Sequence, residues 1–198
     1  EFGRRWSDLL IAEELCAKTL DAGGISSAAS RSLEVEGESG RRRYLLIDRY
    51  DRLSNFGRRG AATLFSYAEC ELGDPSFSAP KVLAAMISQG QLEQSAQEQL
   101  DLVHEFSRAI GNTDSHLGNY GLVFDDAGHA ALAPFFDVLP MAFAPRNDEF
   151  PDRWIAPPAP TTHRVVASLV AHLRSLILAD TRFSTDFQSK WLALLASP

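Results

Sequence analysis

Cysteine, long apolar runs and excess positive charge are all scarce in this chain, and each scarcity removes a class of protein. Only Cys16 and Cys70 occur among 198 residues, and their spacing fits neither a disulfide framework nor a metal site. No run approaches the ~18 apolar residues that a membrane-spanning helix needs, and no signal peptide opens the sequence. Two isolated cysteines suit a reducing compartment, so we expect a cytoplasmic protein with no membrane partner.

Positive charge is outweighed, because the formal net charge is −7 at pH 7. Nucleic acids are held by clustered Lys and Arg, so an acidic chain is a poor partner for them. The dense basic runs "GRRW" (3–6), "GRRRY" (40–44) and "GRRG" (57–60) lie beside glycine, and we interpret them as solvated turn residues. We therefore expect no direct nucleic-acid binding by this chain. Its overall composition is that of a soluble globular protein with one core or two small lobes.

The first residues, "EFGRRW", contain no methionine and lead at once into a helical pattern. We interpret residues 1–3 as a cloning scar or the edge of a cut, and we expect a piece of a longer protein. A helix is predicted over 7–22, with Ser7 as its N-cap and a stop at two glycines. Glu13 falls on the apolar stripe of this helix, whereas Glu14 faces away. Glu13 therefore either has a buried cationic or hydrogen-bonding partner or reaches solvent at the edge of the stripe.

Apolar periodicity predicts a mainly helical α+β chain with small β-hairpins. The expected helices cover 7–22, 63–70, 79–88, 95–110, 162–179 and 184–196, and the expected strands cover 30–36, 44–48, 120–124 and 129–136. The apolar run "YLLI" ends in the charged and aromatic segment "DRYDR" (48–52). We interpret this strand and its exit as a rigid connection between lobes. A Pro-rich loop, "PPAP" (157–160), is too short to be read as a recognition motif.

The stretch "GNTDSHLGNY" (111–120) fits neither a helix nor a strand, although apolar segments flank it. It carries Asp114 and Asn119, and Asp137 follows the expected hairpin after it. Because a hairpin brings its ends together, Asp137 should return near Asn119. Such oxygen ligands suit Mg²⁺, which keeps several waters and needs few protein ligands. The spacing Asp-x-x-x-x-Asn is that of a protein-kinase catalytic loop, with Asp as base and Asn on a metal.

Two other interpretations of this loop stay open from the residues alone. Asn112, Asp114 and Asn119 are also typical turn formers, whose side chains bond to nearby backbone groups. A metal-dependent phosphoesterase would use an acidic cluster as well. Only one His near the cluster, and no His-x-His or His-Asp pair, argues against that third possibility.

Four stretches together resemble the HipA-like serine/threonine kinase family. They are "RWSDLLIAEEL" (5–15), "LLIDRYDR" (45–52), "IGNTDSHLGNYGLVFDD" (110–126) and "LAPFFDVLPMAFAP" (132–145). In order and spacing the resemblance covers nearly the whole chain, and it is most specific over 110–145. The ending "LPMAFAP" is similar to a subgroup whose members carry an N-terminal DNA-binding region. The resemblance implies a protein-kinase-like C-terminal lobe at 53–198, preceded at 1–52 by the tail of the N-terminal lobe and the hinge.

The resemblance also implies ATP and Mg²⁺ as cofactors and assigns roles within the loop. Asp114 matches the catalytic base, and Asn119 and Asp137 match the magnesium ligands. His116 stands two residues after the base, where other protein kinases have a phosphate-contacting Lys. It either contacts the γ-phosphate, braces the loop or is purely structural.

Residues nearer the N-terminus match the nucleotide site of the family. The backbone around Asp48 and Tyr50 matches the hinge that hydrogen-bonds adenine, and Glu13 matches the helix glutamate that pairs with the ATP-anchoring lysine. The chain departs from a complete kinase because no Gly-rich loop and no strand lysine precede the first helix. We therefore expect this chain to bind nucleotide weakly at best and not to turn over by itself.

Two functions from different classes follow from these features. The first is the C-terminal part of a kinase that transfers the ATP γ-phosphate to a protein hydroxyl, in a toxin–antitoxin or regulatory setting. Family members act on proteins such as aminoacyl-tRNA synthetases or on themselves, and the full-length protein would have an antitoxin or a DNA-binding region as partner. The alternative is a non-catalytic, kinase-like sensor module of a transcriptional regulator.

Overall fold

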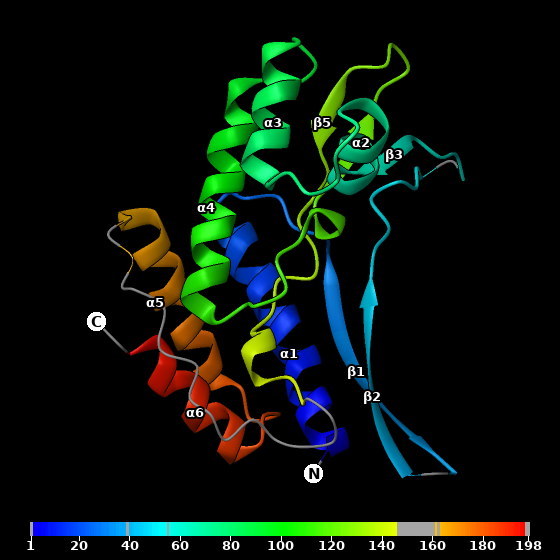
Figure 1. The fold of residues 1–198 in the computed structure, drawn as a ribbon. Helices are drawn as coiled ribbons and strands as arrows, with labels where there is room; N and C mark the ends of the chain where they lie inside the picture. Colours follow the sequence, from blue (N-terminus) through cyan, green and yellow to red (C-terminus); the bar gives the residue numbers. More distant parts are fainter. Residues whose placement is uncertain (1, 39, 55, 146–160, 162, 197–198) are drawn as a thin grey trace.

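The computed structural model describes residues 2–38, 40–54, 56–145, 161 and 163–196 (Figure 1). The elements are, in chain order, α1 (Phe2–Ala22), β1 (Ser30–Gly37), β2 (Gly40–Ile47), β3 (Gly60–Thr63), α2 (Leu64–Glu71), α3 (Ala79–Ser88), α4 (Gln94–Ile110), the 3₁₀ turn η1 (Leu117–Asn119), β4 (Gly121–Phe124), β5 (Ala130–Leu132), the 3₁₀ turn η2 (Met141–Phe143), α5 (Arg164–Ala179) and α6 (Thr185–Leu195). The predicted mainly helical α+β class is confirmed. The predicted Pro-rich loop at 157–160 lies outside the described residues.

The β1–β2 hairpin and α5 both pack against α1, which runs between them (Figure 1). The hairpin is antiparallel, with Ser30 opposite Ile47 and Gly37 opposite Gly40. Its second strand begins at Gly40, four residues before the predicted start at 44. The added residues are "GRRR" (40–43) of the basic run, which the sequence had suggested to be a turn.

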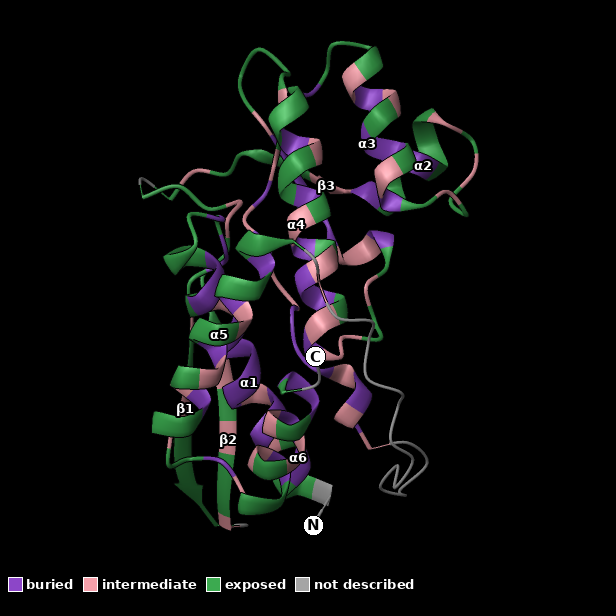
Figure 2. Cartoon of the chain, turned by 90° about the vertical axis from the view of Figure 1, so that its left-hand side faces the viewer, coloured by how far each residue is buried: buried purple, intermediate pink, exposed green. Residues whose placement is uncertain are grey.

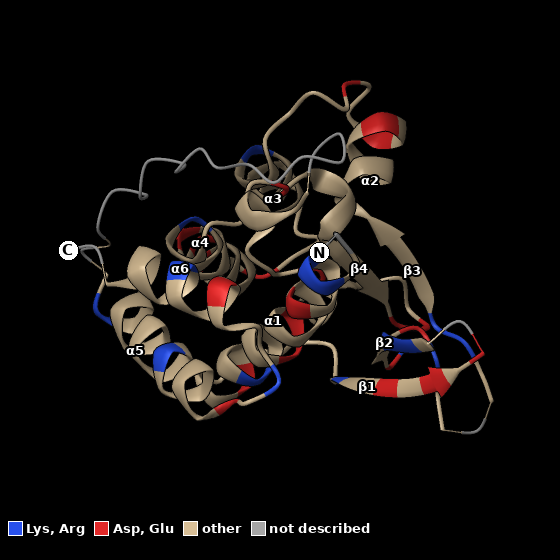
Figure 3. Cartoon of the chain, turned by 90° about the horizontal axis from the view of Figure 1, so that it is seen from below, with Lys and Arg blue, Asp and Glu red and all other residues tan. Residues whose placement is uncertain are grey.

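Glutamates on β1 explain why this basic run forms a strand. Arg43 binds Glu34 at 2.7 Å, and Arg41 lies 3.1 Å from both Glu34 and Glu36. Opposite charges facing each other across an antiparallel pair stabilise it modestly. Figure 3 shows Lys and Arg spread over several elements and interleaved with Asp and Glu. The run is therefore matched by acidic neighbours within its own hairpin.

A second, three-stranded sheet has the order β3-β4-β5 and is antiparallel throughout. Thr63 on β3 lies opposite Gly121 on β4, and Leu122 on β4 lies opposite Leu132 on β5. Strand β3 was not predicted, because "GAAT" has low strand propensity and its partner is distant in sequence. Its last residue, Thr63, also caps α2 by accepting a hydrogen bond from the Ser66 N–H at 3.1 Å.

The strand predicted over 129–136 is shorter in the structure and covers only Ala130–Leu132. Pro134 has no N–H to donate to a ladder, which limits how far a strand continues. The chain stays extended beyond it, and Phe135 forms an isolated parallel bridge with Ser27. This bridge ties the approach to Asp137 to the connection between α1 and β1.

The hydrophobic core runs along α1, α4, α5 and α6, whose inner faces are buried (Figure 2). On α4, Val103, Phe106 and Ile110 are fully buried, and Leu102 is partly buried against the same core. Trp191 on α6 is also fully buried and donates its indole N–H to the Ile110 carbonyl at 3.1 Å. Among the described residues, no helix has the length and apolar character needed to cross a bilayer.

Two expectations about α1 were wrong. The helix begins at Phe2, so Ser7 is not its N-cap but lies within it and accepts a hydrogen bond from Arg43 at 2.8 Å. Glu14 was expected to face away from the apolar stripe of the helix, but it is buried as well, since only 4% of it is exposed. It binds Lys18 at 2.6 Å and Arg182 at 2.9 Å, and it accepts two hydrogen bonds from Ser32. The hairpin and the α5–α6 loop cover this side of α1, which helical periodicity alone could not indicate.

Those contacts hold Glu14 in its ionised form. Burial raises the pKa of the carboxyl, but the hydrogen bonds from Lys18, Arg182 and Ser32 outweigh it and lower the pKa to about 2. The buried carboxylate therefore links α1 to β1 and to the segment before α6.

Candidate active site

The polar loop begins where α4 ends, at Gly111. This glycine has φ = 84°, and its N–H bonds back to the last turn of the helix. A Cβ at this position would lie 2.9 Å from the Leu194 side chain, so the tight packing also favours glycine. Asn112 then accepts a hydrogen bond from the Asp114 N–H at 3.0 Å, which turns the chain sharply. The turn chemistry considered for Asn112 is thus present.

Asn119 is oriented by the backbone of Asp114. Its side-chain NH₂ donates to the Asp114 carbonyl at 2.9 Å, across the five residues that separate them. This bond fixes the amide plane, and the amide oxygen is on the opposite side from the NH₂ group. The bond therefore places the Asn119 side chain next to the residue that carries the half-exposed Asp114 carboxylate.

His116 lies beside the Asp114 carboxylate without bonding to it. The Gly118 N–H donates to His116 Nδ1 at 3.0 Å, so the neutral ring carries its proton on Nε2. Nε2 lies 3.9 Å from Asp114 Oδ1, which is too long for a hydrogen bond. His116 thus braces the loop through Gly118 and keeps an N–H near the carboxylate.

Asp137 is held in a left-handed backbone conformation, with φ = 58°. For a non-glycine residue this conformation costs of order 1–3 kcal/mol, and such residues cluster at functional sites. The strand-like segment before it is clamped by two backbone bonds, from the Ala28 N–H to the Phe135 carbonyl at 2.8 Å and from the Phe135 N–H to the Ser26 carbonyl at 2.9 Å. The surrounding structure therefore fixes the position of Asp137 firmly.

The carboxylate of Asp137 reaches the polar loop of residues 111–120, as the hairpin argument predicted. Burial raises its pKa first, and the nearby Asp114 charge raises it further. A hydrogen bond with the Asn119 side chain and the field of His116 act in the opposite direction. Side chains from positions 114, 119 and 137 therefore share one small region.

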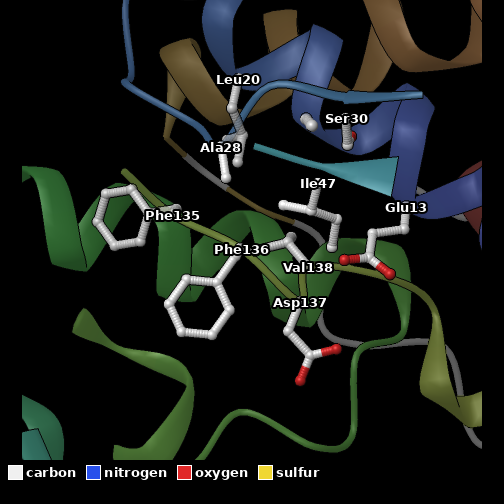
Figure 4. A pocket seen from close by; sticks show the side chains of 10 residues that line it. Glu13, Leu20, Ala28, Ser30, Ile47, Phe135, Phe136, Asp137 and Val138 are labelled. Atoms are coloured by element: carbon white, nitrogen blue, oxygen red, sulfur yellow. The ribbon is translucent and has the colours of Figure 1, made fainter. Parts of the chain in front are cut away.

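Glu13 approaches the same region from α1. Figure 4 shows its carboxylate beside the backbone of Asp137 and Val138, while the Asp137 carboxylate points away from it. Burial and the Asp137 charge raise the pKa of Glu13 to about 7, and a hydrogen bond from the Asp137 backbone opposes this. Of the two possibilities left open for Glu13, the buried one holds, since only 9% of the residue is exposed.

A small cavity of about 10 Å³ separates α1 from the segment that ends in Asp137. Glu13, Ser30 and Phe136 are among the residues in its wall (Figure 4). The Ser30 hydroxyl is buried and has no hydrogen-bond partner within the described part of the chain. The cavity has room for about one water molecule.

The segment predicted as the hinge follows β2. The Asp48 N–H is already used, since it donates to the Ala29 carbonyl at 2.9 Å. The Tyr50 ring stacks on Phe136 with centroids 5.8 Å apart, next to Asp137. A Cβ on Gly121 would lie 2.8 Å from the Ala133 Cβ and 2.9 Å from the Tyr50 hydroxyl, so a glycine is favoured there. Tyr50 thus connects this segment to the residue before Asp137.

The site contains two residues that sequence analysis missed, Phe136 and Gly121. Phe136 directly precedes Asp137 in "FFD", but nothing in the sequence pairs it with Tyr50. Gly121 follows the polar loop, and its role depends on the close approach of a distant side chain. Of the two, only Phe136 could have been found from the sequence, because it is an aromatic residue directly before Asp137.

The donor set decides which metals would suit this region. Among the described residues, no group of three or more His, Cys, Asp or Glu side chains is placed to hold a metal ion. Asn119 and Asp137 supply one amide oxygen and one carboxylate, which fits Mg²⁺ completed by phosphate oxygens and water. A tightly caged metal such as structural zinc does not fit.

The chain has the features of a protein-kinase-like large lobe. They are a polar loop after a buried helix, an Asp–Asn pair five residues apart, and a second Asp that returns across a short sheet. The match to known sequences is specific. Residues 2–176 match the HipA-like C-terminal domain family, and the chain belongs to that family.

Known proteins agree with this assignment. Toxin YjjJ of Escherichia coli (strain K12) is 32% identical over 144 residues, which are 73% of this chain and 31% of that protein. The chain therefore spans about a third of the length of this curated relative. HipA of Shewanella oneidensis MR-1, solved with HipB and operator DNA, has a TM-score of 0.58 at 15% identity, covering 94% of this chain and 55% of the other.

A second solved structure shares the fold. The proinflammatory kinase CtkA of Helicobacter pylori has a TM-score of 0.58 at 13% identity, covering 93% of this chain and 77% of the other. At these identities the two structures establish the fold of this chain, namely the one found in HipA and CtkA.

Proposed function

We propose that this chain is the C-terminal part of a serine/threonine protein kinase that transfers the γ-phosphate of ATP to a protein hydroxyl. The observation that carries the proposal is the convergence of Asp114, Asn119 and Asp137, with the Asn119 amide fixed on the Asp114 carbonyl at 2.9 Å. Family membership supports the same conclusion.

Each side chain has a role that its position supports. The substrate hydroxyl attacks the γ-phosphorus, the bond to the ADP oxygen breaks, and Asp114 accepts the hydroxyl proton. Asn119 and Asp137 would hold Mg²⁺, which neutralises the phosphate oxygens when it is bound. His116, with a proton on Nε2, is placed to donate a hydrogen bond toward the transferred phosphate.

The nucleotide would lie between the two parts of the chain, 1–52 and 53–198. Because the Asp48 N–H bonds to Ala29, adenine would use the Asp48 carbonyl and the Tyr50 N–H. Glu13, buried beside Asp137, would pair with an ATP-anchoring lysine outside this chain. Such a cation would neutralise a carboxylate for which burial is costly.

The full-length protein would act in a toxin–antitoxin or regulatory setting. The Escherichia coli relative YjjJ is named a toxin, and the Shewanella HipA was solved with HipB and operator DNA. We accordingly propose an antitoxin or a DNA-binding region as its partner and a cellular protein, or the kinase itself, as substrate.

Phosphotransfer from radiolabelled ATP tests the proposal in the full-length protein. Asp114→Asn should lower the rate by about 10²–10⁴, because a positioned base is lost while the fold is kept. Asp126→Asn, an exposed change on the β4–β5 turn, is the matched control and should keep the rate. Full activity of Asp114→Asn would exclude Asp114 as the base, and ATP binding without any transfer by the unmodified protein would favour the sensor module.

A further inference from the structure

A hollow of about 640 Å³ opens beside the polar loop of residues 111–120. Its walls come from α2, the segment between α2 and α3, the start of α3, His104 on α4, and the chain around Ser115–Gly118 and Tyr120. Most of its surface is apolar, and Phe65, Pro75, Phe77 and Leu117 are among the apolar residues in its wall. Its volume lies within the ordinary range for ligand sites, so it has room for one large side chain.

The charges around the hollow select its occupant. None of the described residues in its wall is Asp, Glu, Lys or Arg, and its titratable groups are the imidazoles of His104 and His116 and the phenol of Tyr120. Lys81 lies 3.5 Å from the centre of the Phe77 ring and so covers one face of it with a positive charge. The wall therefore suits an uncharged apolar group and offers no partner for a lysine or arginine.

The hollow adjoins the proposed phosphotransfer site through His116. His116 lies in its wall, and His116 Nε2 is 3.9 Å from Asp114 Oδ1. An extended peptide advances roughly 3.3–3.6 Å per residue. A hydroxyl presented to Asp114 therefore places the side chains one or two residues away at the mouth of the hollow.

We propose that this hollow selects the substrate, by receiving an aromatic or branched aliphatic side chain within about two residues of the phosphorylated Ser or Thr. The inference rests on the proposed kinase function and adds a sequence preference to it. Phe65, which is 43% exposed, is the wall residue best placed to contact an incoming side chain without supporting the core.

The test uses the full-length protein and Ser- or Thr-centred peptides in which each flanking position is Phe, Leu, Ala or Glu in turn. Burying one such side chain corresponds to roughly a tenfold or larger change in affinity, so Phe or Leu should lower KM about tenfold at one position relative to Ala. Phe65→Ser should reduce that preference to within about twofold and leave the Mg²⁺–ATP melting shift unchanged. Val165→Ser, a change of equal exposure on α5, should keep the preference.

Peptide binding separates this inference from the kinase proposal. Fluorescence anisotropy of labelled Phe- and Ala-containing peptides is measured on the Asp114→Asn protein, where no chemistry is needed. Preference for Phe that disappears in the Asp114→Asn, Phe65→Ser double variant supports the hollow even if the unmodified protein phosphorylates nothing. Equal binding of the two peptides, or a preference that survives Phe65→Ser, overturns the inference even if the kinase is active.

Discussion

Replacing Glu13 with glutamine should change how the stability of this chain depends on pH. Glu13 is 9% exposed and lies beside Asp137, and its pKa is raised from 4.5 to about 7. Glutamine keeps the length of the side chain and can still accept the hydrogen bond from the Asp137 backbone. The substitution therefore removes the titration with little change in packing.

The direction in which stability changes with pH follows from the protons that the folded and unfolded chains bind. Between pH 4.5 and about 7 the folded chain holds a proton on Glu13 that the unfolded chain has lost, so raising the pH through this interval destabilises the fold. At 1.36 kcal/mol per pH unit, the interval corresponds to about 3 kcal/mol. The raised pKa of Asp137 acts in the same direction. Glu14, held near pKa 2 by Lys18 and Arg182, acts oppositely, and its contribution is lost as the pH falls from 4.5 toward 2.

Urea unfolding at pH 5 and pH 7.5 measures the effect. The unmodified chain should lose stability between these values, and Glu13→Gln should lose about 2–3 kcal/mol less. Glu98→Gln, an exposed change on α4, should behave like the unmodified chain. An identical pH dependence in Glu13→Gln and the unmodified chain would refute the assignment of a protonated, buried Glu13.

Three further predictions concern the metal ligands, the buried ion pair and the loop. In the full-length protein, ATP with Mg²⁺ at ~100 times its Kd should add ~2.7 kcal/mol to the folding stability and so raise the melting temperature. Asn119→Ala or Asp137→Ala should remove most of this Mg²⁺-dependent rise, and an unchanged rise counts against both residues as metal ligands. Arg182→Met should destabilise the chain by about 2–4 kcal/mol in urea unfolding, because Glu14 loses a buried partner, and a loss below about 0.5 kcal/mol would show the pair to be solvated. Gly111→Ala should cost about 1–2 kcal/mol from its positive φ, and unaltered stability would contradict that conformation.

The sequence predicted the elements whose signal is local. The helix over 95–110 was recoverable because its apolar stripe repeats every three or four residues, and it is observed as α4 at Gln94–Ile110. Strand β3 could not be predicted, since its four small residues become a strand only by pairing with β4. Burial of Glu14 was equally hidden, because it depends on Arg182, 168 residues away.

The candidate site shows the same division. Asp114 and Asn119 are close in sequence, and a short hairpin was enough to predict that Asp137 returns beside them. The stacking of Tyr50 on Phe136 was not foreseeable, because it joins two segments that no motif connects. The positive φ of Asp137 was hidden as well, since it arises from clamping of the preceding segment against Ser26 and Ala28.

The most direct measurement is a crystal structure of the full-length protein with Mg²⁺ and a non-hydrolysable ATP analogue. The proposed function predicts a Mg²⁺ ion bonded to the Asn119 amide oxygen and the Asp137 carboxylate at roughly 2.0–2.1 Å, with the γ-phosphate facing Asp114. A triphosphate bound elsewhere, or a metal that touches neither Asn119 nor Asp137, would contradict it.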